Sequence, residues 1–162
     1  PYNLLERGAE ADILPYCAEH GLLSLTYGVL CRGLLSGKIT AERRFAPGDL
    51  RRFDPKLRKK RFPQYLAALE RLGALAADHG KSLLALAVRW ALQQPGVGSV
   101  LWGVRRKEQL APVSEAFGWT LDDDALAAVE AILVEEIRDP VGPEFMTPGH
   151  RPEVAPQGAE EA

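Results

Sequence analysis

The sequence has little histidine and cysteine, two residue types that bind zinc and often serve in catalysis. Among its 162 residues are three histidines and two cysteines. No two histidines share a helical turn, and the cysteines stand too far apart for the close spacing of a zinc site. The GxSxG motif of hydrolases and the P-loop motif are also absent. The sequence therefore predicts no metal site and no catalytic residue of a recognisable kind.

Long apolar runs and a strong net charge are lacking as well. No run approaches the roughly 20 residues of a membrane span, and no signal peptide is visible. The net charge is -2, which gives no field for wholesale binding of nucleic acid. Cys17 and Cys31 lie in apolar or helical contexts, which favours reduced thiols. We expect one cytoplasmic domain with no nucleic-acid or membrane partner. The start at Pro1 in place of Met indicates a processed or truncated product.

Apolar periodicity and glycine punctuation predict two strands among several helices. The strands span 22–27 and 97–102, and the helices span 9–20, 64–78, 83–93, 107–117 and a last segment that starts at 121–122. Ser82 and Asp122 are predicted helix N-caps. His20 and His79 each end a helix beside a glycine, where a capping role is far more common than catalysis. Residues 39–62, rich in Arg and Lys, are predicted to form a long loop.

Strands separated by helices favour a parallel sheet with helical crossovers. Two strands alone leave both sheet edges open and little face to bury. The pattern therefore indicates an α/β fold that is incomplete.

Both predicted strands lead into glycine-marked basic loops. The first continues as YGVLCRGLLSGK at 27–38, and the second continues into Gly103 and a run of Arg105, Arg106 and Lys107. Two interpretations stay open: turns that need flexible backbone beside a solvated charge run, or loops that close on phosphate groups. Tyr27 is either a base or stacking surface at the rim, or a buried aromatic with its hydroxyl exposed, which is the more common case.

Four separated segments, in order, resemble the aldo/keto reductases. They are PYNLLER at 1–7, ILPYCAEHGLLSLTYGVLCRGLLSGK at 13–38, SVLWGVRRKEQL at 99–110 and DPVGPEF at 139–145. The likeness covers nearly the whole chain to about residue 147. It is closest to bacterial members of the family that resemble voltage-gated potassium channel beta subunits.

The resemblance implies a (β/α)8 TIM barrel that reduces aldehydes and ketones with NADPH. The chain would be its C-terminal part: the end of strand six, then strands seven and eight with their helices. Residues 1–147 would form this partial barrel, and 148–162 a disordered tail. The family's catalytic Asp, Tyr, Lys and His would all precede residue 1, so no catalytic residue is assigned here.

Half of a cofactor site is implied by the same resemblance. Tyr27 would stack on the nicotinamide, 28–32 would wrap the pyrophosphate, and the adenosine end would meet residues of three later segments. The implied set is Tyr27, Gly28, Val29, Leu30, Cys31, Arg32, Lys38, Arg51, Gly103, Arg105 and Gln109. Arg105 would favour NADPH over NADH. Departures from the family pattern are Gly28-Val29 in place of Ser-Pro, and Pro112-Val113 in place of Glu-Asn.

Three functional hypotheses follow. The first is a fragment of an NADPH-dependent aldo/keto reductase, inactive alone, whose intact protein takes a small carbonyl substrate and whose partner is the missing N-terminal barrel half. The second is a non-catalytic barrel remnant that associates with itself or with a partner through its open strand edge. The third is a cofactor-binding or structural relic without turnover.

Overall fold

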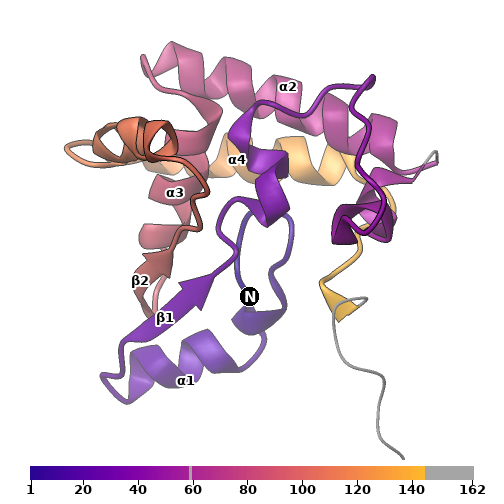
Figure 1. Cartoon of the computed structure of the whole chain (residues 1–162). Coiled ribbons are helices and arrows are strands. Elements are labelled where there is room, and N and C mark those ends of the chain that lie inside the picture. The colour runs from indigo at the N-terminus through magenta and orange to yellow at the C-terminus, as the bar shows by residue number, and fades with distance from the viewer. Residues whose placement is uncertain (59, 145–162) are drawn as a thin grey trace, which may run out of the picture.

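A computed structural model describes residues 1–58 and 60–144 (Figure 1). The predicted tail at 148–162, and the last residues of the predicted domain, lie outside this part of the chain. The elements are α1 (Ile13–Glu19), β1 (Ser24–Tyr27), α2 (Phe62–Asp78), α3 (Leu83–Leu92), β2 (Val97–Leu101) and α4 (Asp123–Glu136), with 3₁₀ helices at Gly8–Glu10, Cys31–Ser36, Leu50–Arg52, Pro55–Leu57 and Lys107–Ala116.

The two predicted strands are confirmed, and they pair in parallel. Tyr27 lies opposite Leu101, so both strands end at the same edge of the sheet. The amide of Tyr2 donates to the carbonyl of Tyr27 at 3.0 Å. This backbone hydrogen bond ties the N-terminal segment to the end of β1, while the sheet itself consists of β1 and β2.

The predicted helix caps are also confirmed. Ser82 Oγ accepts a hydrogen bond from the amide of Ala85 at 3.2 Å, and Asp122 Oδ1 accepts one from Ala125 at 2.8 Å. His20 and His79 each occupy a helix C-cap, with Nδ1 2.9 Å from the backbone carbonyl four residues earlier. Both histidines therefore end helices, as their positions beside glycine predicted.

Two predicted helices differ from the structure at their ends or in kind. The helix predicted at 9–20 begins only at Ile13, because Asp12 caps it there and accepts from the Ile13 amide at 2.6 Å. The segment predicted as a helix at 107–117 is a 3₁₀ helix that contains Pro112. A proline inside a helix removes an amide donor and clashes with the preceding turn, which accounts for the tighter geometry.

The core lies on one face of the sheet, under α3. Trp90 of α3 is 1% exposed and stacks on Tyr2 with ring centroids 5.5 Å apart. Figure 1 shows α2 and α4 side by side, where they pack together and α2 also contacts α3. Thr26 of β1 is buried on this face. The helices thus cover one side of the two strands.

The opposite face of the sheet is bare. Leu23 is 78% exposed, Leu25 66%, Tyr27 55% and Leu101 51%. Leu25 and Tyr27 alternate with buried Thr26, and Tyr27 pairs with Leu101, so these side chains share one face. Contiguous exposed apolar side chains mark a surface that is made to be covered.

Gly96, between α3 and β2, packs closely against the backbone of α1. Its φ is 81°, and a Cβ there would lie 2.3 Å from the Leu14 carbonyl oxygen. We expect Gly96→Ala to lower the free energy of unfolding by about 2–3 kcal/mol, from left-handed strain and a backbone clash. Gly21→Ala is the matched control: its φ is 64° with open space around it, so it should lose only about 1 kcal/mol. Equal losses in urea unfolding would show that the clash contributes nothing.

Candidate functional site

The candidate site lies where β1 and β2 end. Because the strands are parallel and Tyr27 pairs with Leu101, the loop that begins at Gly28 and the loop that contains Gly103 leave the same edge. Ligands of α/β sheets and barrels bind at this edge, in the loops that follow the strands. The structure therefore brings together the two segments that the sequence predicted to be functional.

The loop after β1 has an unusual backbone. Gly28, Cys31, Arg32 and Gly33 all have positive φ values, of 72°, 44°, 55° and 96°. Left-handed conformations are rare for residues with a side chain and concentrate at functional sites, where the surrounding structure holds them. Turn hydrogen bonds of 2.8 Å join the Cys31 amide to the Gly28 carbonyl and the Gly33 amide to the Leu30 carbonyl. The loop is thus coiled tightly against the sheet edge.

The side chains of this loop divide between the interior and the solvent. Val29 and Cys31 are buried, at 1% and 0% exposure, and Leu30 is half-buried. Burial raises the pKa of the Cys31 thiol, and the nearby carboxylate of Glu6 raises it further. Tyr27 and Lys38 are exposed. The thiol is therefore neutral and unreactive, and the aromatic ring of Tyr27 is open for stacking.

Arg51 comes from the long loop and lies against the loop after β1. Its Nη1 is 3.9 Å from the position that a Cβ on Gly33 would occupy. Three hydrogen bonds from its guanidinium to the Asp49 carboxylate, the shortest 2.6 Å, fix the side chain. Hydrogen bonds from Arg51, with a smaller contribution from the charge of Arg105, hold the pKa of Asp49 at about 2. Asp49 thus orients Arg51, which lies beside the loop that follows β1.

Gln109 organises the loop after β2. Its Oε1 accepts hydrogen bonds from the amides of Arg105 and Arg106, at 2.7 and 3.0 Å. These bonds satisfy amides at the start of the 3₁₀ helix and leave the Arg105 side chain exposed. Gly103, just before, is exposed too, and a Cβ there would meet nothing within 4 Å. Gln109 thus positions Arg105.

Arg32 is the exception among the predicted site residues, because its guanidinium is turned into the protein. Nε donates to Asp54 Oδ2 at 2.9 Å, and Nη1 donates to Glu6 Oε2 at 3.2 Å. Lys56 Nζ lies 2.7 Å from Glu6 Oε1. The interpretation that the cations of this loop face phosphates does not hold for the Arg32 side chain, although its backbone still lies in the loop.

Sequence reasoning missed this ionic cluster, which consists of Glu6, Arg32, Asp54 and Lys56. The side chains of Asp54 and Lys56 are 0% exposed and that of Glu6 is 1%. Burial opposes ionisation of Glu6, but hydrogen bonds from Arg32 and Lys56, and their charges, outweigh it and lower its pKa below the ordinary value. A run of basic residues is typical of a solvated surface, so the segment gave little reason to expect buried charges. The local signal for an ordered turn was Asp54-Pro55-Lys56, in which the aspartate side chain accepts a hydrogen bond from the Lys56 amide.

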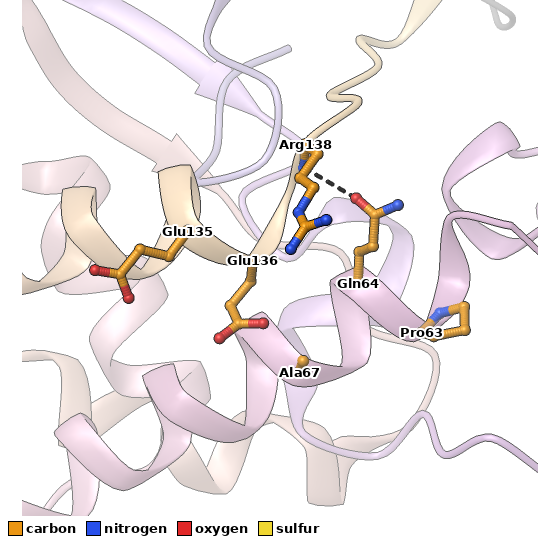
Figure 2. Close-up of a pocket in the computed structure, with 6 residues that line it drawn as sticks. All are labelled: Pro63, Gln64, Ala67, Glu135, Glu136 and Arg138. Carbon is orange, nitrogen blue, oxygen red and sulfur yellow. Dashed lines mark hydrogen bonds between the residues drawn. The ribbon is translucent and has the colours of Figure 1, made fainter.

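Cavities also lie away from this edge, in the described part of the chain. Figure 2 shows one of about 280 Å³ between α2 and the end of α4, where Gln64 accepts a hydrogen bond from the Arg138 amide at 2.9 Å. Its carboxylates, Glu135 and Glu136, are paired with Arg71. A second, of about 400 Å³, lies between residues 4–8, α4 and 140–144. Neither is lined by a predicted cofactor residue.

Residues 1–58 and 60–144 contain neither a metal-ligand cluster nor a helix that could span a membrane. In this part of the chain no group of three His, Cys, Asp or Glu side chains is arranged to hold a metal ion. Over the same residues, no helix has both the length and the apolar character that crossing a membrane requires. Cys17 and Cys31 are both free thiols.

Known proteins resemble this chain over most of its length. The family model "Aldo/keto reductase family" matches residues 1–134. The aldo-keto reductase YhdN of Bacillus subtilis is 50% identical over 155 residues, which are 95% of this chain and 47% of that protein. The structure of the glycerol dehydrogenase AKR11B4 from Gluconobacter oxydans superposes with a TM-score of 0.83 at 46% identity, over 91% of this chain and 45% of that one.

More distant relatives carry two informative names. A probable voltage-gated potassium channel subunit beta of rice is 31% identical over 67% of this chain and 34% of its own length. The NADH-specific methylglyoxal reductase of Escherichia coli is 29% identical over 85% of this chain and 40% of its own length. The chain spans about half the length of the Bacillus subtilis and Gluconobacter oxydans proteins. The family match, the identities and the superposition agree, and the chain belongs to the aldo/keto reductase family.

Proposed function

We propose that the chain supplies the cofactor-binding part of an NADPH-dependent aldo/keto reductase that converts aldehydes or ketones to alcohols. It corresponds to the C-terminal part of the barrel, with β1 and β2 as strands seven and eight. The observation that carries this proposal is the meeting of two loops and Arg51 at the edge where both strands end. Catalytic groups come from outside the chain, so it is inactive alone.

The residues at this edge suit a dinucleotide. Tyr27 offers an exposed ring for the nicotinamide, and the left-handed backbone of 28–33 brings main chain close to the pyrophosphate. Arg51 and Arg105 offer guanidinium forks for phosphate oxygens. Bound NADPH would supply the hydride, while these residues bind and orient it. The free thiols support a cytoplasmic location.

Titration with NADPH and NADH tests the cofactor. We expect Arg105→Gln to weaken NADPH binding by about tenfold and to leave NADH binding unchanged, because the loss is one charge-assisted contact to the 2′-phosphate. Arg106→Gln, which changes the exposed neighbour, is the matched control and should bind both cofactors as the unchanged chain does. Fluorescence titration gives the affinities, and near-UV circular dichroism shows that each variant is folded.

Equal losses for NADH and NADPH would contradict the assignment of Arg105 to the 2′-phosphate. The Escherichia coli relative is named an NADH-specific reductase, so preference of the unchanged chain for NADH is a real alternative. That preference would overturn NADPH as the cofactor and would retain the cofactor site. Absence of saturable binding to a folded chain would overturn the cofactor-binding proposal.

A second candidate function is a self-association or partner-binding module. It is favoured by the bare sheet face formed by Leu23, Leu25, Tyr27 and Leu101. Sedimentation as a concentration-dependent dimer, with no cofactor binding, would favour this function over the first. A monomer that binds cofactor would favour the first.

A further inference from the structure

The buried ionic cluster of Glu6, Arg32, Asp54 and Lys56 joins segments that are far apart in the sequence. Glu6 belongs to the N-terminal segment, Arg32 to the loop after β1, and Asp54 and Lys56 to the long loop. Within it, the carboxylates of Glu6 and Asp54 face the cations of Arg32 and Lys56, so each charge has an opposite charge beside it. Arg32 belongs both to this cluster and to the loop after β1, so the cluster is connected to the proposed cofactor site.

Lys56 contacts both the N-terminal segment and the segment that follows α4. Its ammonium lies 2.7 Å from Glu6 Oε1 and 3.2 Å from the Gly142 carbonyl oxygen, which follows α4. Asp54 Oδ1 is 3.8 Å away. The Lys56 side chain is 0% exposed, and a lysine is buried in this way only where its charge is met by partners. Lys56 therefore holds the N-terminal, long-loop and C-terminal segments in one arrangement.

The same cluster holds the left-handed backbone of the loop after β1. Arg32 has a φ of 55°, a conformation that costs about 1–3 kcal/mol and persists only when its surroundings fix it. Its guanidinium is fixed by Asp54 at 2.9 Å and by the same Glu6 carboxylate that Lys56 contacts. Through Glu6, Lys56 thus orients the anchor of the strained turn.

The long loop connects the ionic cluster to Arg51. Two short 3₁₀ helices, Leu50–Arg52 and Pro55–Leu57, are each capped by an aspartate that accepts from the amide two residues on, at 3.0 Å in both cases. Lys56 lies in the second helix beneath the phosphate loop, and Arg51 lies in the first beside Gly33. Two consecutive capped turns thus link the backbone at Lys56 to the backbone at Arg51.

We infer that Lys56 is a positioning residue for the dinucleotide-phosphate loop: it never touches the cofactor, but through Glu6 and Arg32 it fixes the backbone of 31–33 and, through the long loop, the place of Arg51. The inference rests on the proposed cofactor site. According to this inference, a buried lysine that makes no contact with the cofactor still contributes to cofactor affinity.

The test uses Lys56→Met, which keeps the length of the side chain and removes its charge. We expect NADPH affinity to fall by about tenfold. Hydrogen exchange in the peptide 31–36 should quicken by at least about tenfold, while exchange in α2 and α3 stays unchanged. Lys81→Met is the matched control, since Lys81 lies over Trp119 away from the loop, and it should alter neither readout.

A charge-balanced double variant, Glu6→Gln with Lys56→Met, separates positioning from stability. Removing one charge of each sign should restore most of the unfolding free energy lost by Lys56→Met. Affinity and loop exchange should stay defective, because the link from Glu6 to the C-terminal segment is still missing. Recovery of affinity together with stability would overturn the inference, as would unchanged loop exchange in Lys56→Met. If the unchanged chain binds no NADPH, the cofactor proposal fails, while loop exchange still tests whether Lys56 holds the loop.

Discussion

Replacing Glu6 with leucine is expected to lower the free energy of unfolding by about 3–5 kcal/mol, the usual cost of removing one partner from a buried ion cluster. Glu6 is the carboxylate shared by Arg32 and Lys56. Without it, Arg32 and Lys56 both lose the carboxylate that they share, and Lys56 has no exposure to water through which to recover hydration. Urea unfolding of the two chains measures the difference.

Glu130→Leu is the matched control for this prediction. Glu130 also pairs with an arginine, Arg7, at 2.5 Å, but its side chain is 47% exposed. A solvent-exposed ion pair contributes at most about 1 kcal/mol. Similar losses in the two variants would contradict the view that burial makes the Glu6 cluster important for stability.

The effect of Glu6 should also appear in the pH dependence of stability. The pKa of Glu6 is lowered on folding, so its contribution is fully present above its ordinary value of 4.5 and is lost as pH falls through the lower folded value. The unchanged chain should therefore lose stability between pH 5 and the folded pKa more steeply than Glu6→Leu does. Parallel curves would show that Glu6 titrates alike in the folded and unfolded chains.

The sequence allowed the elements of the fold to be predicted where local signals and burial agree. The two strands are short apolar runs bounded by glycine, and Ser82 and Asp122 are capping residues placed directly before helices. The helix predicted at 107–117 is present as a 3₁₀ helix, because Pro112 in its interior lacks an amide donor. Local pattern identified the element but not its geometry.

The location of the candidate site could be predicted from the sequence, but the roles of its side chains could not. Strand ends located the two loops, because parallel strands bring their C-terminal ends to one edge. The inward turn of Arg32 depends on Glu6 and Asp54, which are distant in sequence, and the burial of Lys56 is set by tertiary packing. In a basic segment, nothing local distinguishes a buried lysine from a solvated one.

The bare sheet face yields the prediction with the largest expected effect. We propose that this face is the barrel interior of the intact protein and is covered by the rest of the barrel, since the chain spans only 47% of its Bacillus subtilis relative. The half of that relative which this chain does not match is the probe. We expect it to bind the chain, and Leu25→Asp to weaken binding by at least about 100-fold, because an aspartate would be buried without a partner.

Val134→Asp provides the comparison that makes this prediction decisive. Val134, on α4, is 76% exposed and Leu25 66%, so in the isolated chain both changes should alter stability by less than about 0.5 kcal/mol. They differ in that Leu25 lies on the sheet face and Val134 on an outer helix. Calorimetric titration with the complementary half should therefore give wild-type affinity for Val134→Asp alone. Equal affinity for both variants would mean that the exposed sheet face is not the surface that the rest of the barrel covers.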